Sequence, residues 1–187
     1  MHKTLIIIPA RYGSKGLKDK NILKIKNKHL VEFPILTAKK FSFPKEIYVT
    51  TDDDRVIKIA KKNNLKVYFK RPKNISGDKT PTSEVVIHSL NFFKKKNNYY
   101  PKYFILLQPT TPFRSAPEIS KNFYNFIKSK KKTLLSVCDA IHHPSEYITI
   151  NSNKLKYVMN KNNAKRRQDF KSIYFYRKSI NEKNFED

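Results

Sequence analysis

Residues 5–21 read LIIIPARYGSKGLKDKN, an apolar run followed by a basic turn. The run Leu5–Ile8 is closed by Pro9, which predicts a short strand buried on both faces, as in a parallel sheet. The stretch Ala10–Asn21, called here the basic loop, holds two of the three glycines of the chain. Glycines let backbone amides approach a polyphosphate, and Lys or Arg side chains supply cations to it. The pattern therefore favours a phosphate site over a plain surface turn.

The basic loop matches neither of two widespread phosphate motifs. It lacks the GxxxxGK[ST] of P-loop proteins and the GxGxxG of dinucleotide-binding folds. The cations that it brings to the end of the first strand are Arg11, Lys15 and Lys20. These three side chains are the first candidates for contact with a bound phosphate.

Apolar runs and helical spacings alternate along the chain to about residue 140. Because strands and helices alternate, the chain is predicted to form an α/β fold with an open, mostly parallel sheet and helices on both faces. Asp52–Asp54 is predicted to cap the second helix, and Thr82 or Ser83 the third. The predicted strands after the first are 46–50, 65–69, 103–107 and 134–138, and the predicted helices include 30–41 and 117–129.

We expect a single domain over residues 1–187, with its core at about 1–140. The α/β pattern weakens after that point, and two short antiparallel strands are predicted at 147–150 and 154–159. They would form a small β extension, an arm over about 141–170. Residues 171–187 show little periodicity and are predicted to be an irregular tail.

The charge and composition restrict the class of protein. A net charge of +25 is compatible with nucleic-acid binding, but lysines are spread along the whole chain, which favours a solvated basic surface that also attracts anionic substrates. No apolar stretch approaches the roughly 20 residues of a membrane helix. The single cysteine, Cys138, allows no internal disulfide, as is typical of a reducing compartment. We therefore expect a soluble, cytoplasmic protein without a membrane partner.

Several motifs together resemble the acylneuraminate cytidylyltransferase family, which makes CMP-activated sialic acids and their bacterial relatives. The first is the stretch IIIPARYGSKGLKDKN at residues 6–21. The others follow in order: TTDD at 50–53, RP at 71–72, SGDKTPTSEVVIHSL at 76–90, LLQPTTPFR at 106–114, HHP at 142–144 and RQD at 167–169. The resemblance implies a Rossmann-like nucleotidyltransferase fold.

The resemblance also implies a reaction. The anomeric hydroxyl of a nonulosonic (sialic-type) sugar acid attacks the α-phosphorus of CTP, pyrophosphate leaves, and Mg²⁺ assists. Such sugars are used in cell-surface polysaccharides. Arg11 and Lys20 would stabilise the charge that develops on the phosphates. The remaining expected contacts are Ser14, Lys15 and Asn21 to the triphosphate, Arg71, Thr80 and Thr82 near cytosine and ribose, and Gln108 and Arg167 to the sugar acid.

The family pattern is not followed to its end. After its RQ motif the family continues into a strand and a segment whose two aspartates hold the metal, whereas residues 173–178 read IYFYRK and no Asp-x-Asp pair follows residue 140. The chain therefore resembles a C-terminally truncated or degenerate member, with no protein ligand for Mg²⁺ identified and activity expected to be impaired. The pair His142-His143 and the lone Cys138 have no metal-ligand spacing.

Three other functions stay open on the sequence alone. One is an inactive remnant that still binds CTP. Another is a 3-deoxy-manno-octulosonate cytidylyltransferase, whose family shares IPAR but continues the loop differently. The third and least favoured is a nucleic-acid-binding module driven by charge. The partial arm at about 141–170 leaves a homodimer open as well.

Overall fold

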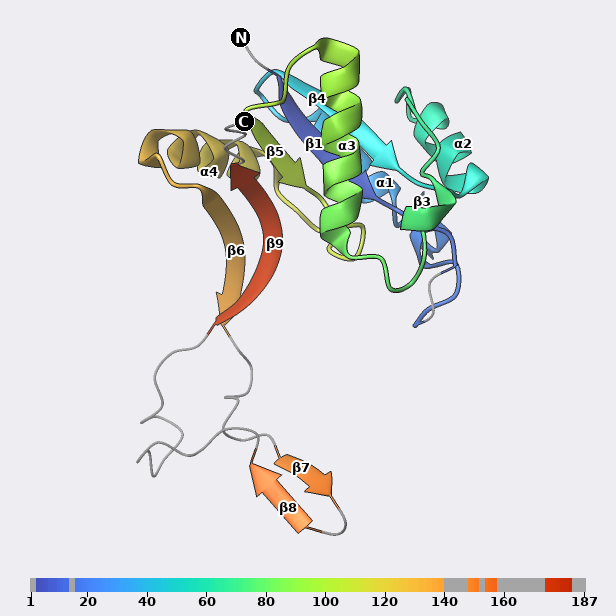
Figure 1. Ribbon diagram of the computed structural model, residues 1–187, viewed down its shortest axis with the longest axis vertical. Coiled ribbons are helices and arrows are strands. Elements are labelled where there is room, and N and C mark those ends of the chain that lie inside the picture. The colour runs from blue at the N-terminus through green and yellow to red at the C-terminus, as the bar shows by residue number, and fades with distance from the viewer. Residues whose placement is uncertain (1–2, 14–15, 140–147, 152–153, 158–173, 183–187) are drawn as a thin grey trace. The chain divides into compact units, whose positions relative to one another are not determined.

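A five-stranded sheet with the order β4-β1-β5-β9-β6 organises the chain in a computed structural model. The structure describes residues 3–13, 16–139, 148–151, 154–157 and 174–182 (Figure 1). In the parallel part of the sheet, β1 (Thr4–Pro9) pairs with β4 (Lys45–Thr50) on one side and β5 (Tyr103–Leu106) on the other. The predicted strand at 5–8 is therefore the central parallel strand.

Helices connect and cover these strands. The four α-helices in the described part of the chain are α1 (Glu32–Lys39), α2 (Asp54–Lys62), α3 (Thr82–Asn97) and α4 (Ala116–Ser129). The remaining elements are the 3-10 helices η1 (Lys20–Ile22) and η2 (Lys73–Ile75), and the strands β2 (Lys24–Ile25), β3 (Lys28–His29), β6 (Thr133–Asp139), β7 (Ile148–Asn151), β8 (Lys154–Tyr157) and β9 (Tyr174–Glu182).

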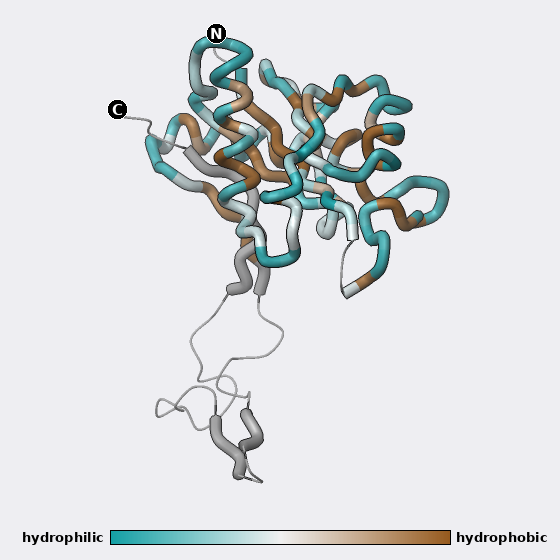
Figure 2. Tube along the Cα trace, turned by 45° about the vertical axis from the view of Figure 1, so that its right-hand side comes forward, coloured by the Kyte–Doolittle hydropathy of each residue, from teal (hydrophilic) through white to brown (hydrophobic). Residues whose placement is uncertain are grey.

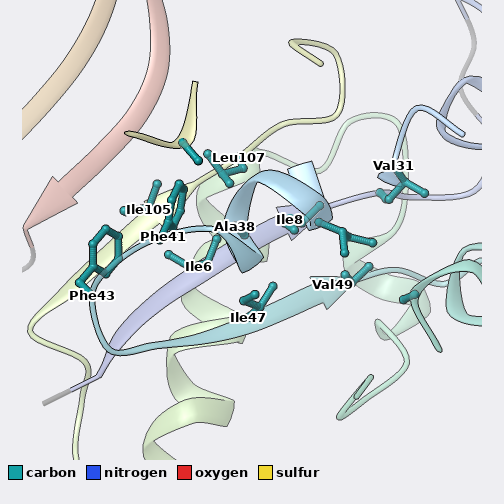
Figure 3. Close-up of a cluster of buried hydrophobic side chains, with 14 of the residues drawn as sticks. Ile6, Ile8, Val31, Ala38, Phe41, Phe43, Ile47, Val49, Ile105 and Leu107 are labelled. Carbon is teal, nitrogen blue, oxygen red and sulfur yellow. The ribbon is translucent and has the colours of Figure 1, made fainter. Parts of the chain in front are cut away.

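Both faces of the sheet are packed, because successive side chains of β1 point to opposite sides. Ile6 and Ile8 belong to a core with α1, α2 and α4, shown in Figure 3. Leu5 and Ile7 belong to a second core with α3, which crosses the other face in Figure 1. All four side chains have no exposed surface. Figure 2 shows the apolar strands inside and hydrophilic turns outside. The predicted α/β fold with helices on both faces is confirmed.

The predicted third strand, Leu65–Phe69, is wrong. Residues 65–70 have no ladder partner among the described residues, and the neighbouring backbone bond runs from Arg71 N to Thr51 O, at 2.7 Å. The apolar pattern has a different cause: Leu65 and Val67 pack against one core, while Tyr68 and Phe69 pack against the other. Alternating apolar residues in this stretch report burial on two sides and not strand pairing.

The C-terminal part differs from the predicted irregular tail. Residues 174–182 form β9, which pairs antiparallel with β5 so that Ile180 lies opposite Ile105. The predicted antiparallel strands after residue 140 are present as the hairpin β7–β8, in which Asn151 pairs with Lys154. The chain divides into two compact units, residues 1–134 with 178–187 and residues 135–177. The second unit contains this hairpin.

The third helix is not capped as predicted. Neither Thr82 nor Ser83 is its N-cap: the cap is Pro81, which makes no side-chain capping bond, and α3 begins at Thr82 itself. The second helix follows the prediction, since the Asp53 side chain accepts the backbone N–H of Arg55 and caps α2. The Thr82 hydroxyl is therefore not used as a cap.

Candidate active site

The basic loop leaves the carboxyl end of β1 in a tight turn. Gly13 adopts φ +64, a left-handed conformation that glycine takes without the steric cost of a Cβ. Asn21, which is buried, donates from Nδ2 to the carbonyl of Arg11 at 3.0 Å and accepts the N–H of Val31 on its own carbonyl. The two ends of the loop are therefore tied together next to the strand end. Its cations Arg11 and Lys20 face the same space.

A buried arginine forms the second wall. The Arg71 side chain is 4% exposed, donates from Nε to the Thr50 hydroxyl at 3.0 Å, and donates from Nη2 to the Thr50 carbonyl. The same carbonyl accepts the N–H of Ala10 at the start of the basic loop. Burial lowers the pKa of Arg71 to about 10, and Asp52 opposes this shift. The group still carries its positive charge at neutral pH, so the wall is cationic.

The third wall comes from α3 and the end of β5. Thr80 and Thr82 stand at the N-terminus of α3, where free backbone N–H groups and the helix dipole favour negative charge. Gln108 follows β5, and its carbonyl accepts a hydrogen bond from Arg114 Nη2 at 2.9 Å. Arg114 thereby fixes the turn that presents Gln108 to the pocket.

These walls enclose a pocket of about 250 Å³ at the carboxyl ends of β1, β4 and β5. Ligands of open α/β sheets bind at this edge, to which the arrowheads of β4 and β5 point in Figure 1. The predicted site residues that line the pocket are Arg11, Lys20, Asn21, Arg71, Thr80, Thr82 and Gln108. The structure thus brings together residues from four separate motifs, while the predicted Ser14, Lys15 and Arg167 lie outside the described residues.

The pocket also contains residues that the prediction did not assign to it. Pro109 and Thr110 continue the turn after β5, and their place in the motif LLQPTTPFR was the available signal. Gly77 lies close to Thr80, whose hydroxyl is 3.6 Å from the position of a Cβ built on that glycine. Val85, a buried residue of α3, lines the pocket as well. The apolar side chains that line the pocket are Pro9, Val85 and Pro109.

The cation Arg11 is engaged within the protein. Its Nη1 donates to the carbonyls of Tyr12, at 3.1 Å, and Gly13, at 2.6 Å, and its Nη2 forms an ion pair with Asp78. Asp78 and Arg11 are both partly exposed. A phosphate that binds in the pocket therefore competes with a carboxylate for Arg11.

The acidic side chains around the pocket also have partners. Asp52 accepts the N–H of Tyr12 at 2.8 Å, Asp53 caps α2, and Asp19 pairs with Arg55 at 2.7 Å. Among residues that the structure describes, no three His, Cys, Asp or Glu side chains are grouped as a metal site requires. The pair His142-His143 lies outside the described residues, as does the side chain of Cys138.

The arrangement defines a class of protein. A parallel sheet that ends in a pocket of two arginines, a lysine, hydroxyls and carboxamides is suited to a nucleoside triphosphate, and the class is a nucleotidyltransferase. The sequence model of the cytidylyltransferase family matches residues 5–185. The chain belongs to this family.

Individual relatives agree with this assignment. The chain is 28% identical to pseudaminic acid cytidylyltransferase of Campylobacter jejuni over 173 residues, which are 92% of this chain and 74% of that protein. It is 31% identical to CMP-N,N'-diacetyllegionaminic acid synthase of Legionella pneumophila, covering 80% of this chain and 64% of that one. The structure of a CMP:2-keto-3-deoxy-manno-octonic acid synthetase complexed with CTP aligns with a TM-score of 0.68 and 16% identity over 96% of this chain and 73% of that one, a likeness of fold.

Two further expectations concern a membrane-spanning helix and the class of enzyme. No helix in the described part of the chain is both long enough and apolar enough to span a bilayer. The described residues and the family together support an enzyme of the nucleotidyltransferase class, as the motifs predicted.

Proposed function

We propose that this chain transfers CMP from CTP to the anomeric hydroxyl of a nonulosonic acid and releases pyrophosphate. The observation that carries the proposal is the pocket in which Arg11, Lys20 and Arg71 meet at the carboxyl edge of the parallel sheet. Relatives whose names specify pseudaminic and legionaminic acids support the class of sugar acid. Which acid of this class is used is part of the test below.

The charge of the pocket matches the chemistry of phosphoryl transfer. In such transfer the protein contributes mainly positioning and neutralisation of charge on the phosphate oxygens. In the proposal Arg11 and Lys20 stabilise the charge on the α-phosphate and on the leaving pyrophosphate. Asn21 holds the backbone of the basic loop at Arg11, so that the two cations keep their separation. Ser14 and Lys15 complete the proposed triphosphate contacts.

The remaining pocket residues suit the nucleoside and the acceptor. Arg71, Thr80 and Thr82 offer a cation and two hydroxyls for polar groups of cytosine and ribose. Because Arg71 is held by Thr50 on two of its nitrogens, its orientation is fixed before a ligand binds. Gln108 is the proposed contact to sugar hydroxyls, and Arg167 the proposed contact to the sugar carboxylate.

Dependence on Mg²⁺ belongs to the proposal, but the described residues do not fit a ready metal site. Protein-bound Mg²⁺ is usually held by one or two carboxylates. Asp52, Asp53, Asp19 and Asp78 each already accept an N–H or pair with an arginine. We therefore assign no protein ligand to the ion and derive no step through it. Titration of activity with MgCl₂ against EDTA measures the requirement.

The proposal extends to location and assembly. A cytoplasmic enzyme would meet CTP where the nucleotide is made, and the basic surface attracts this anion at low salt. A homodimer is the proposed assembly, and light scattering of the purified chain measures it.

One experiment tests the function directly. The purified chain is incubated with CTP, MgCl₂ and, in separate reactions, pseudaminic, legionaminic, N-acetylneuraminic and 3-deoxy-manno-octulosonic acids. Pyrophosphate release and the mass of the CMP-sugar are measured. We expect a product with at least one of the first three acids. Product with the eight-carbon acid alone would reassign the acceptor.

A second candidate function is an inactive domain that binds CTP. One observation favours it: the carboxylates described near the pocket are already engaged by N–H groups and arginines. This candidate predicts that CTP raises the melting temperature through binding to the native state, without release of pyrophosphate. Stabilisation by CTP with no product from any of the four acids would support it against catalysis.

A further inference from the structure

One arginine connects the basic loop to the start of α2. Arg55 lies in the first turn of α2, and its Nη2 donates to Asp53 Oδ2 at 2.8 Å and to Asp19 Oδ1 at 2.7 Å. Its Nε donates to Asp53 Oδ1 at 3.0 Å. Asp19 directly precedes Lys20 of the pocket, yet it is separated from Arg55 by 36 positions in the sequence. We call the group Asp53–Arg55–Asp19 the clasp.

The helix end of the clasp is fixed. The side chain of Asp53 is 6% exposed and accepts the N–H of Arg55 at 2.9 Å, which caps α2. The backbone N–H of Asp53 donates to the Thr51 hydroxyl at 3.0 Å, next to the carboxyl end of β4. Asp53 is therefore held in place by burial and by two backbone hydrogen bonds. The part of the clasp that can be positioned is Asp19, on the basic loop. The guanidinium fork of arginine suits two carboxylates at once, whereas a lysine offers a point charge.

A second set of contacts joins the other end of the loop to the same place. The Arg55 guanidinium carbon lies 5.1 Å from the centre of the Tyr12 ring, and the N–H of Tyr12 donates to Asp52 Oδ1 at 2.8 Å. Tyr12 directly follows Arg11. Asp52 and Arg55 therefore contact the chain next to each of the two loop cations that line the pocket, Arg11 and Lys20.

We propose that Arg55 and Asp19 are positioning residues, which hold Lys20 and Arg11 where a nucleoside triphosphate needs them. The inference rests on the proposed function. Neither Arg55 nor Asp19 lines the pocket, so they act through the loop and not by touching the ligand. Asp19 has φ 56, and the turn that follows, with the N–H of Ile22 bonded to the Asp19 carbonyl at 2.9 Å, begins η1 and directs Lys20.

The substitution Asp19→Asn separates positioning from simple charge. Asparagine accepts the left-handed conformation of this position, so the backbone is preserved. The change removes one negative charge near an anion site. Charge alone therefore predicts tighter CTP binding, whereas loss of the clasp predicts weaker binding. We expect the Kd for CTP to rise about three- to tenfold, as for loss of a charge-assisted contact. Tighter or unchanged binding, measured by titration calorimetry, would overturn the proposal.

Variants of the arginine provide the second comparison. Arg55→Ala and the control Lys61→Ala each remove one positive charge from α2, and Lys61 is exposed and far along the helix from the clasp. We expect Arg55→Ala to raise the KM for CTP well above the control, with a smaller fall in kcat. Arg55→Lys should recover only part of the loss, because it keeps the charge without the fork. Equal KM values for Arg55→Ala and Lys61→Ala would contradict the clasp.

A measurement without nucleotide tests the clasp separately from the function. Hydrogen exchange of the amides of Ile22 and Leu23, which bond within η1, should be faster in Asp19→Asn than in the unchanged chain. Equal exchange would overturn the clasp whether or not CTP binds. If the unchanged chain fails to bind CTP, the proposed function is wrong. Faster exchange in Asp19→Asn would then show that the clasp stabilises the loop, and the proposal that it positions cations for a nucleotide would be overturned.

Discussion

Asp78 forms an ion pair with Arg11, a cation of the candidate triphosphate site. Arg11 also donates to the carbonyls of Tyr12 and Gly13, so its guanidinium is directed back onto its own loop. The carboxylate and a phosphate cannot both occupy the same face of this guanidinium. The pair therefore opposes CTP binding, while the clasp at Arg55 supports it.

The first prediction concerns this pair. Asp78→Asn removes the competing carboxylate, and we expect the Kd for CTP to fall about threefold, the scale of a partly exposed ion pair. The control is Asp54→Asn, which breaks the exposed pair with Lys70. Calorimetric titrations of both variants measure the effect. Weaker binding in Asp78→Asn would show that Asp78 supports the site.

Two similar substitutions are expected to change the affinity for CTP in opposite directions, which makes the first prediction more specific. Asp78→Asn and Asp19→Asn both remove one carboxylate from the neighbourhood of the basic loop. If the surrounding charge alone controlled binding, both would strengthen it. We expect Asp78→Asn to strengthen it and Asp19→Asn to weaken it.

The second prediction concerns the cation Lys20. Lys20→Ala should lower kcat/KM for CTP about 100-fold or more, the scale for loss of a group that stabilises developing charge. Lys24→Ala, an exposed lysine just beyond η1, is the matched control and should stay near the activity of the unchanged chain. Initial rates of pyrophosphate release give both values. Similar rates for the two variants would remove Lys20 from the proposed catalytic pair.

The third prediction concerns stability of the core. Ile6 is fully buried between β4 and β5, and Ile6→Ala should lower the free energy of unfolding by about 2–5 kcal/mol, since it removes apolar contacts and leaves a cavity. Ile87 on α3 is 45% exposed, and Ile87→Ala should cost less than about 1 kcal/mol. Urea unfolding followed by circular dichroism compares them. Equal losses would contradict the assignment of Ile6 to the core.

The fourth prediction concerns acid. Burial acts to raise the pKa of Glu32, but hydrogen bonds from Asn63 Nδ2, at 3.0 Å, and from the His29 N–H, at 2.6 Å, outweigh it and hold the pKa below its usual 4.5. A carboxylate with a lowered native pKa stabilises the fold above its unfolded pKa, and this contribution is lost as the pH falls through the native one. The free energy of unfolding should therefore decrease as the pH falls below about 4.5.

The test of this prediction is the slope of stability against pH. Glu32→Gln keeps an oxygen acceptor but cannot titrate. The free energy of unfolding of this variant should therefore fall less steeply as the pH decreases below 4.5, the usual pKa of the group. Urea unfolding at a series of pH values measures the slope. A steeper decline in Glu32→Gln would contradict the assignment. Salt-bridge partners such as Asp54, whose pKa is lowered by Lys70, contribute to the same decline in both proteins.

The central fold was predictable because its signals are local. Leu5–Ile8 has no polar face, which strands covered on both sides require, and the Asp53 cap precedes a helix in the usual position. The error at Leu65–Phe69 has a local origin too, since its aromatic and branched residues are apolar enough for a strand. Whether this segment forms a strand depends on a backbone partner for it beside β4. The sequence of the segment itself does not indicate whether that partner is present.

The strand β9 was missed for a related reason. Residues 174–182 mix tyrosine, lysine and asparagine, and neither a helical nor a strand period is clear in them. Their partner is β5, which supplies the ladder at Ile105 and Phe104. A strand of low local propensity can be stabilised by an apolar neighbour that is distant in sequence.

The candidate site was predictable as a set of motifs but not as a geometry. The residues of the basic loop, Arg71 and Gln108 were named from sequence patterns, and the structure shows that Arg11, Lys20 and Asn21 of the loop line one pocket with them. The contacts that hold them were not foreseeable. Asp19 and Arg55 are far apart in the chain, and their pairing depends on how the basic loop folds against α2.

The pairing of β5 with β9 has a consequence for synthesis of the chain. During translation β1, β4 and β5 have all been made by residue 106, but the hydrogen-bonding edge of β5 that faces β9 has no partner until residues 180–182 have been made. An uncovered edge strand such as Tyr103–Leu106 can pair with another nascent chain. A ribosome stalled between residues 107 and 180 would hold this edge open, so slow codons in that interval should favour aggregation and binding by chaperones.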